Sequence, residues 1–296
     1  MLSRDLAMAL AGKSANTSGR NTSLAGRAGA SALKMLAVLV VSAAAAVAVS
    51  GQSARETVVK IVAQIQRADY EGDRAALKRL YGELTPFVED KELASRVRYW
   101  RGFALWRRAI NGGNDSVDPK ELEEDFKTAV GEFNISAVKD PSFVDAKIGA
   151  LSCLGFLMYM NQKDPARMQE LIAQASPLSK DAKAADPDNP RLLWVLGPSI
   201  WNAPPERGGG QDKAIETTIK GLVEARKRRG TVKSPLDPSW GEPELLMGLA
   251  WDTMHKTTPD LNAAEKYARA ALEMVPYWHY VRDILLPQIM TAKAKS

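Results

Sequence analysis

Helix-breaking Asp-Pro pairs recur along the chain and constrain its fold more than any other feature. They stand at 140–141, 186–187 and 237–238, and Val275-Pro276 continues the series, at spacings of 46, 51 and 38 residues. Proline lacks a backbone donor and disfavours helix in the residue before it, so each pair is expected to end a helix. In the stretch 186–197 (DPDNPRLLWVLG), Pro190 then opens the next helix after a short turn. Recurring units of this length predict stacked supersecondary elements.

The segments between these stops carry apolar residues at the three-to-four-residue spacing of amphipathic helices. Expected helices cover residues 54–68, 74–84, 91–110, 119 toward 140, 144–160, 165–185, 190–201, 213–229, 242–254 and 261–274, with a terminal helix opening at Pro276. The helix at 144–160 is apolar nearly all round, so we expect it to be central. The expected helix at 91–110 should stop at the segment Asn111-Gly112-Gly113-Asn114. No segment alternates like a strand, which predicts an all-α fold of stacked antiparallel helix hairpins.

Small residues mark the last hairpin, with Gly248 in its first helix, Ala264 and Ala271 in its second, and Pro276 after it. This series resembles the tetratricopeptide (TPR) repeat, in which small residues let paired helices cross closely and hairpins stack into a right-handed solenoid. The corresponding packing positions in the other units are Gly102, Ala129, Pro141, Ala175, Pro187, Gly197 and Ala214. The resemblance covers roughly residues 90–285. The repeats are irregular, because the family unit is 34 residues long, no unit here has the whole pattern, and Leu151 stands where glycine is usual.

The first 52 residues have the composition of a targeting segment. A basic stretch precedes the apolar run Met35–Val49 (MLAVLVVSAAAAVAV), and small residues follow it. This is the pattern of a secretory signal peptide, with cleavage expected after Ser50 or Gly51, which would leave the body in the periplasm or secreted. The alternative is an uncleaved inner-membrane anchor at residues 35–54 that keeps the body outside the cytoplasm. Either way, residues 53–296 form the expected helical domain, and only the anchor would contact a membrane.

The basic charge of the chain belongs to this leader. The whole sequence has a net charge of +5 at pH 7, and its first 50 residues hold Arg4, Lys13, Arg20, Arg27 and Lys34 against Asp5 alone. The remaining body is therefore near neutrality, which argues against a nucleic-acid partner. With Cys153 as the sole cysteine in the sequence, no internal disulfide is possible, and its apolar surroundings indicate a buried small residue.

The TPR resemblance implies a concave groove lined by the first helix of each pair. The groove positions that carry over are Arg96, Tyr99, Phe103, Trp106, Arg107, Asp145, Ile148, Ser152, Phe156, Arg191, Trp194, Trp201 and Asn202. Aromatic and arginine residues dominate binding hot spots, and arginine suits the carboxylates of a peptide. The alternative is that the aromatic residues belong to the core. The Lys and Asn arrangement with which the family grips a C-terminal carboxylate is not found in this sequence.

Other motifs predict little chemistry. Gly208-Gly209-Gly210 precedes a helix and could hold an anion, although it lacks the Lys-Ser/Thr of a phosphate loop and reads equally as an inserted turn. The basic run 226–229 ends a helix, where cations complement the dipole or meet an anionic partner. His255 and His279 have no ligands at zinc spacing, and no nucleophile motif is present. We therefore expect no catalytic residue, metal or cofactor.

These observations favour an exported, non-catalytic TPR-like scaffold that binds a protein or peptide partner in its groove. The chain also resembles exported bacterial TPR-like proteins of unknown role. Two alternatives remain open from the sequence. One is a small-ligand or glycan-binding component that serves a transporter, because tryptophans are frequent in the first helices. The other is an all-α envelope enzyme, which would need a pair of acids in a cleft.

Overall fold

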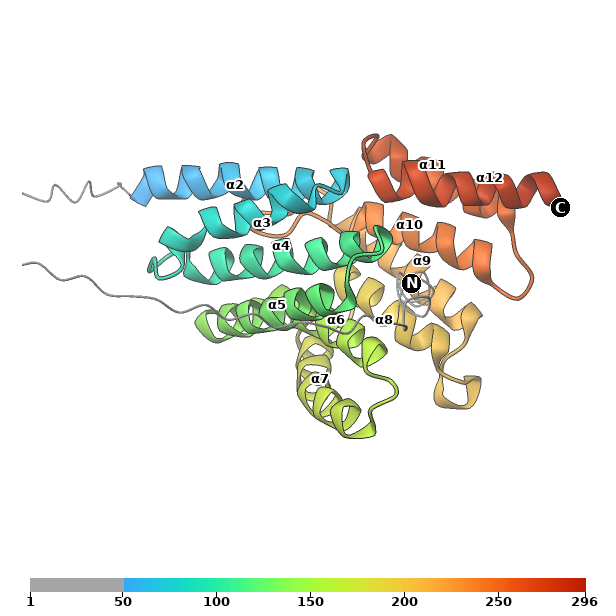
Figure 1. Cartoon of the computed structure of the whole chain (residues 1–296), viewed down its shortest axis with the longest axis horizontal. Helices are drawn as coiled ribbons and strands as arrows, with labels where there is room; N and C mark the ends of the chain where they lie inside the picture. Colours follow the sequence, from blue (N-terminus) through green and yellow to red (C-terminus); the bar gives the residue numbers. More distant parts are fainter. Residues whose placement is uncertain (1–50) are drawn as a thin grey trace, which may run out of the picture.

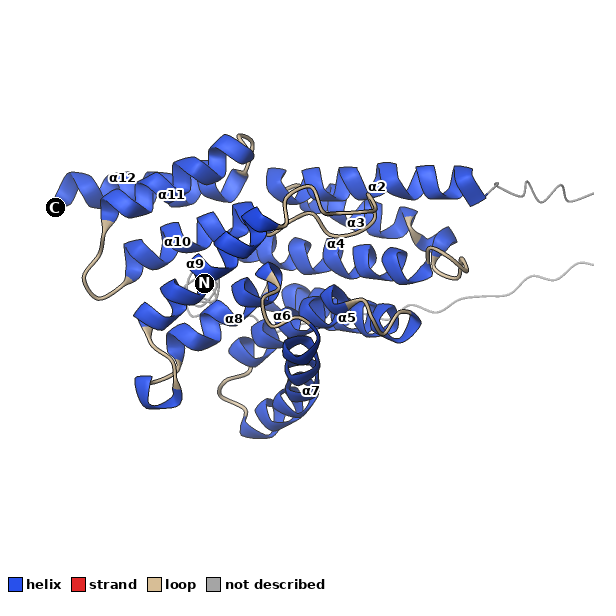
Figure 2. Cartoon of the chain, turned by 180° about the vertical axis from the view of Figure 1, so that it is seen from behind, coloured by secondary structure: helices blue, strands red, loops and turns tan. Residues whose placement is uncertain are grey.

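The computed structural model describes residues 51–296, and in this range the chain is helical with no strand (Figures 1 and 2). The predicted leader lies outside the described residues. Among the described helices, none is both long and apolar enough to cross a bilayer. The α-helices are α2 (Gly51–Glu71), α3 (Arg74–Glu83), α4 (Ala94–Asn114), α5 (Pro119–Lys139), α6 (Val144–Met160), α7 (Pro165–Ala185), α8 (Pro190–Asn202), α9 (Gln211–Lys227), α10 (Glu242–His255), α11 (Leu261–Met274) and α12 (Leu286–Lys295).

Successive helices pack against each other as antiparallel hairpins. The main contacts join α4 to α5, α5 to α6, α6 to α7, α8 to α9 and α10 to α11, while α4–α6 and α6–α8 contacts link one hairpin to the next. Figure 1 shows the helices stacked from α2 at the top through α3, α4 and α5 down to α7, and then back up through α8, α9 and α10 to α11 and α12. The predicted all-α fold of stacked hairpins is confirmed.

Local sequence signals fix most helix boundaries. Aspartate caps the N-termini of α3, α5, α7 and α11, and Asn189 caps α8 by accepting hydrogen bonds from two backbone N–H groups. Pro141, Pro187 and Pro276 lie exposed in the turns just beyond α5, α7 and α11. The helix stops inferred from the Asp-Pro and Val-Pro pairs are therefore correct at these three turns.

The expected stop at Asn111–Asn114 is wrong, because α4 continues through both glycines to Asn114. Gly112 is needed there for close packing: a Cβ atom would lie 2.7 Å from Leu122 Cδ2 and 2.9 Å from Arg74 Nε. The end of the chain also differs from expectation. Pro276 lies in a turn, and a π-helical stretch, η3 (Tyr280–Leu285), leads into α12.

Small residues set the spacing between neighbouring helices, as expected. The Phe133 ring of α5 lies between Gly102 of α4 and Gly149 of α6, where added Cβ atoms would approach it to 3.0 and 2.6 Å. The remaining predicted helical packing positions are also buried: Ala129, Ala175, Gly197, Ala214, Gly248, Ala264 and Ala271. Substitution of Gly149 by any larger residue would push α5 and α6 apart.

Two helices, α4 and α10, are more completely buried than the more apolar α6. On α4, buried residues occupy nearly the whole circumference from Tyr99 to Ala109, and they include Arg101 and Arg107. On α6, Gly155 is exposed and the final turn is only half-buried. The arginines of α4 can be buried because acids on neighbouring helices pair with them, as with Arg101 Nε and Glu132 Oε1 at 2.8 Å.

Candidate functional site

A segment without regular structure, residues 230–241, connects α9 to α10 and is called the strap below. It crosses the α2–α4 side of the molecule, as Figure 2 shows. Gly230 (φ +73°) and Gly241 (φ +134°) bound the strap with backbone conformations that only glycine adopts readily. The strap brings Leu236, Asp237 and Trp240 against helices more than 130 residues earlier in the chain.

The aromatic residues predicted to line a groove meet at Trp240. The Trp240 indole Nε1 donates to the Tyr99 hydroxyl at 2.8 Å, and its ring lies 5.4 Å from Trp106, 5.8 Å from Trp194 and 6.0 Å from Phe103. Edge-to-face contacts at these distances stabilise aromatic clusters beyond simple burial. Four predicted groove residues from α4 and α8 thus contact a single side chain of the strap.

These residues do not line an open groove. Tyr99, Phe103, Trp106 and Arg107 are at most 3% exposed, and Trp194 is 7% exposed. The prediction that they face a partner is wrong for this structure, because the strap covers them. Arg96 and Arg191 are half-buried and lie at the edge of the strap.

The other predicted groove residues lie apart from this cluster. Trp201 is buried against Trp251, while Asn202 is exposed and donates to the Pro198 carbonyl of its own helix. Ile148 and Ser152 are buried within α6, and the Phe156 ring stacks on Phe126. The predicted groove therefore included residues that lie apart from the Trp240 cluster. Helical spacing alone does not fix which turns of a helix face the concave side.

An open cleft of about 880 Å³ lies along the strap and is called the strap cleft. Its walls come from the start of α6, the start of α8, the end of α9, Arg96 of α4 and the strap itself, with Met274 at the end of α11. This volume falls within the range of ligand sites in proteins. Ser239 and Trp240 of the strap belong to its wall and also to the wall of a small inner cavity of about 50 Å³.

Paired charges surround the strap cleft. Arg191 holds Asp145 with both Nε and Nη2, and Arg96 bridges Asp140 and Asp237 at 2.9 and 2.7 Å. Burial alone would lower the pKa of Arg191, but the charge and hydrogen bonds of Asp145 more than offset this effect. The pKa of Arg191 therefore lies above its ordinary value, and the guanidinium stays charged. The cleft is consequently polar and close to neutral in total charge.

The basic run at the end of α9 forms the outer rim of the cleft. Arg228 donates to both carboxylate oxygens of Asp186, at 2.6 and 3.1 Å, and Arg226 and Arg229 converge on Glu242 in the first turn of α10. The side chain of Arg229 is 62% exposed and that of Arg228 is 36% exposed. These exposed pairs leave the guanidinium groups accessible to a ligand.

Two apolar side chains are exposed within the same cleft. Val232 of the strap is 46% exposed and Met274 of α11 is 42% exposed. Large apolar side chains exposed beside arginines are the combination found in binding surfaces. Neither residue could be selected by periodicity, because Val232 lies in a loop and Met274 is the last residue of its helix.

Behind the strap, two buried acids flank one arginine. Arg107 Nε donates to Asp69 Oδ2 at 2.7 Å, and Glu244 Oε1 lies 3.6 Å from Arg107 Nη2 and accepts from the Tyr70 hydroxyl. Burial raises the pKa of both Asp69 and Glu244 although Arg107 opposes the shift. Asp69 and Tyr70 line the inner cavity, which has room for one or two waters.

The glycine loop and the cysteine singled out in the sequence offer no free group for binding a ligand. The N–H groups of Gly208, Gly209 and Gly210 donate to carbonyls of the same loop and the end of α8, so this stretch is an inserted turn. Cys153 is buried, and burial raises the pKa of its thiol well above the usual value. In the described residues, no group of three His, Cys, Asp or Glu side chains is placed to hold a metal.

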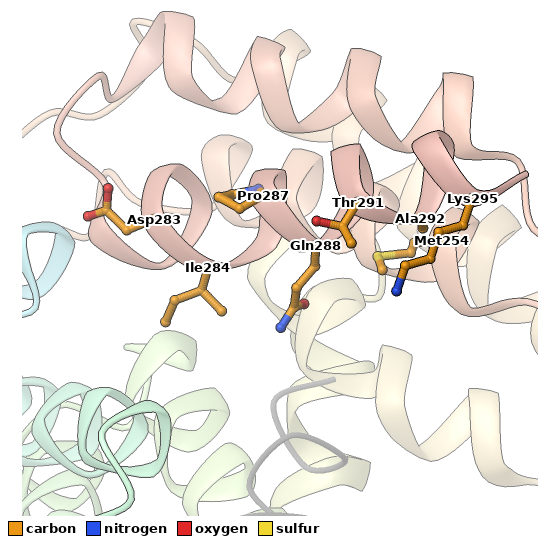
Figure 3. A pocket seen from close by; sticks show the side chains of 8 residues that line it. All are labelled: Met254, Asp283, Ile284, Pro287, Gln288, Thr291, Ala292 and Lys295. Carbon is orange, nitrogen blue, oxygen red and sulfur yellow. The ribbon is translucent and has the colours of Figure 1, made fainter.

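A second, shallower hollow of about 590 Å³ lies along η3 and α12 (Figure 3). Its polar groups are few, and Asp283 there is bound by Arg282 and His279, which hold the pKa of its carboxyl far below the usual value. No buried polar side chain converges on this hollow. We therefore take the strap cleft as the candidate site.

Comparison with known proteins supports the fold. The chain is similar in structure to the HusA haemophore from Porphyromonas gingivalis, with a TM-score of 0.54 and 19% identity over 69% of this chain and 96% of that one. No family model matches the sequence, and no curated protein matches it. At this identity the likeness shows a shared all-α architecture.

Proposed function

We propose that the chain is an exported, non-catalytic binding protein of TPR-like type that holds a segment of a protein or peptide partner in the strap cleft. The observation that carries the proposal is the strap. A loop of the chain without regular structure is already held there by guanidinium, hydroxyl and indole groups of α4 and α8. A surface that holds one such segment in this way has the chemistry to hold another.

The composition of the strap cleft favours a peptide over a simple anion. Each of its arginines is already paired with a carboxylate, and among the described cleft side chains only the Lys233 ammonium has no such pair, so the cleft has no cluster of free positive charge of the kind that holds an isolated phosphate. A peptide offers both charges and apolar side chains together. It can exchange ion pairs at the rim while its apolar groups cover Val232 and Met274.

The test is capture of partners by cross-linking from the envelope fraction, comparing two double variants. Val232→Asp/Met274→Asp places charges in the cleft. Val138→Asp/Ile172→Asp is the matched control, because those residues are 78% and 48% exposed and lie on α5 and α7. We expect one enriched protein, cross-linked to cleft residues, to be lost only with the cleft variant. Equal recovery with both variants would remove the proposal.

A second candidate ligand is haem, because the structurally similar protein is a haemophore. Arg228 and Arg229 at the rim suit the two carboxylates of a haem, and Met274 offers a thioether to the iron. The histidines lie elsewhere: His255 stacks on Trp251, and His279 pairs with Asp283. A saturable Soret shift at one haem per chain, lost with Met274→Ala, would favour haem. An unsaturable or unaltered Soret band would exclude it.

A further inference from the structure

Three contacts to side chains of α4 hold residues 236–240 of the strap. Arg96 Nε donates to Asp237 Oδ1 at 2.7 Å, Trp100 Nε1 donates to the Leu236 carbonyl at 2.8 Å, and the Tyr99 hydroxyl accepts from Trp240 Nε1. An ion pair, a hydrogen bond to the backbone and a hydrogen bond to an aromatic side chain are contacts with which peptide-binding surfaces fix register. Over residues 236–240 the strap therefore occupies α4 as a ligand would.

The side chains of the strap indicate which peptide residues this surface would bind. Asp237 and Trp240 are three residues apart and point into two separate sites, one formed by Arg96 and the other by the aromatic rings. The strap turns between Ser234 and Asp237, where the Asp237 N–H donates to the Ser234 carbonyl at 2.9 Å. It also contacts α2 and α8: Arg55 donates to the Ser234 hydroxyl at 3.0 Å, Gln66 to the Ser239 hydroxyl at 3.3 Å, and Arg191 to the Trp240 carbonyl at 3.2 Å.

The aromatic site has hydrogen-bonding capacity that the strap does not use. The indole N–H groups of Trp106 and Trp194 are buried without a partner in the described structure. Both rings lie within 6 Å of the Trp240 ring, yet the Trp240 carbonyl accepts from Arg191 instead. Buried donors without acceptors cost stability, so an occupant carrying an acceptor would bind better than the strap does.

The strap is built to leave this surface without disturbing the helices. Gly230 and Gly241 flank it with positive φ angles, and neither α9 nor α10 depends on residues between them for its helical hydrogen bonds. Ser239 and Trp240 also separate the strap cleft from the inner cavity beside Asp69 and Tyr70. Release of the strap would therefore join the two spaces into one longer groove.

We propose that the surface beneath the strap is the docking site for a partner peptide with an acidic residue three positions before a tryptophan. The peptide takes the places of Asp237 and Trp240, and the strap is the internal competitor that it displaces. This inference rests on the proposed peptide-binding function and adds the motif and the mode of entry. It accounts for the burial of the predicted groove residues, because the groove is filled by the chain itself.

The experiment uses a fluorescein-labelled peptide with the sequence of residues 231–241 (TVKSPLDPSWG), added in trans and followed by fluorescence anisotropy. The protein is the full chain in which residues 231–239 are replaced by a Gly-Ser linker and Trp240 is changed to Ala. Two altered peptides, carrying Asp237→Asn or Trp240→Ala, are the controls. We expect saturable binding of the unaltered peptide and binding at least about tenfold weaker for each altered one. No binding to this variant, with its helical circular dichroism retained, would overturn the proposal.

A single substitution provides a second test of peptide binding in case the linker variant does not fold. In the full chain, Asp237→Asn removes one strap contact, while Arg96 remains paired with Asp140. Because the internal copy competes at millimolar effective concentration, loosening it should raise the affinity for the unaltered peptide about tenfold. Asp181→Asn, which makes the same change in an exposed pair with Lys147 away from the strap, is the matched control and should leave that affinity unchanged.

The remaining outcomes each decide the question. Equal peptide affinity for wild type and Asp237→Asn would overturn the proposal. Dimers of the Asp237→Asn chain that bind no peptide would assign the surface to a second copy instead. Peptide binding together with failure to capture any envelope protein would support the groove chemistry while rejecting the proposed function, so the two claims fail separately.

Discussion

The surface beneath the strap and the open strap cleft use the same residue types in opposite ways. Beneath the strap, Arg107 is 4% exposed and pairs with Asp69, which is 3% exposed. At the rim of the cleft, the 62% exposed Arg229 pairs with Glu242 in the first turn of α10. Both are arginine–carboxylate pairs; the first joins α2 to α4 and the second joins the end of α9 to α10. In the first pair both side chains are shielded from water, whereas in the second the guanidinium is exposed although the Glu242 side chain is only 7% exposed.

Burial decides what each pair does. A buried ion pair loses its hydration, so neither partner can be removed without leaving an uncompensated charge. An exposed pair is screened by water and contributes little to stability, so its guanidinium can exchange one carboxylate for another. The buried pairs therefore maintain the shape of the α4 surface, and the exposed pairs are the ones available to a partner.

The largest expected effect is that of Arg107→Ala. It would leave Asp69 and Glu244 buried without their cation, and loss of one partner from a buried pair typically costs about 3–5 kcal/mol of stability. Urea unfolding followed by circular dichroism measures it. Arg79→Ala is the control, because Arg79 is 58% exposed in its pair with Glu83, and it should cost less than about 0.5 kcal/mol. Similar losses for both variants would refute the distinction between buried and exposed pairs.

A second test concerns an acid that lacks such a cation. Asp252 lies on α10, the helix that carries Glu244, and burial raises its pKa to about 7. Since the unfolded carboxyl titrates near about 3.9, the stability present below that pH is lost progressively as the pH rises to about 7, by up to ~1.4 kcal/mol per pH unit. Asp252→Asn should flatten this part of the stability profile.

The control for Asp252 is a carboxyl shifted in the other direction. Arg282 and His279 lower the pKa of the exposed Asp283, so its contribution is present at neutral pH and is lost progressively as the pH falls below about 5, where the unfolded carboxyl begins to bind a proton. Asp283→Asn should therefore leave the profile between pH 5 and 7 parallel to that of wild type. A wild-type profile that is flat across this range would show that Asp252 ionises without cost in the folded chain.

Helix positions were predictable because their signals are local. Asp-Pro pairs and aspartate caps act within a turn of the residues that they affect, which is why the ends of α5, α7 and α11 were placed correctly. Two predictions failed because of packing partners elsewhere in the chain: the helix stop at 111–114 and the central position of helix 144–160. Gly112 remains helical because Leu122 and Arg74 pack on it, and α4 is central because acids on other helices neutralise its arginines.

The strap could not be predicted from local pattern. Trp240 and Tyr99 are 141 residues apart, and no periodicity relates a loop to the helix face that it covers. A signal was nevertheless present: Leu236 and Trp240 are large apolar residues in a Pro- and Gly-rich segment, where water-exposed loops rarely carry them. Six of the predicted groove residues lie around the strap: Arg96, Tyr99, Phe103, Trp106, Arg191 and Trp194.

The smallest expected effect on stability is that of Arg228→Ala at the cleft rim. Its pair with Asp186 is partly exposed, so the free energy of unfolding should change by about 0–1 kcal/mol. Recovery of the cross-linked partner should fall nonetheless, because the side chain lines the strap cleft. Lys220→Ala removes a comparably exposed pair, with Asp188, outside the cleft and should leave recovery intact. A loss of stability as large as that of Arg107→Ala would place Arg228 among the structural pairs, and the cleft would then have no exchangeable cation at that rim.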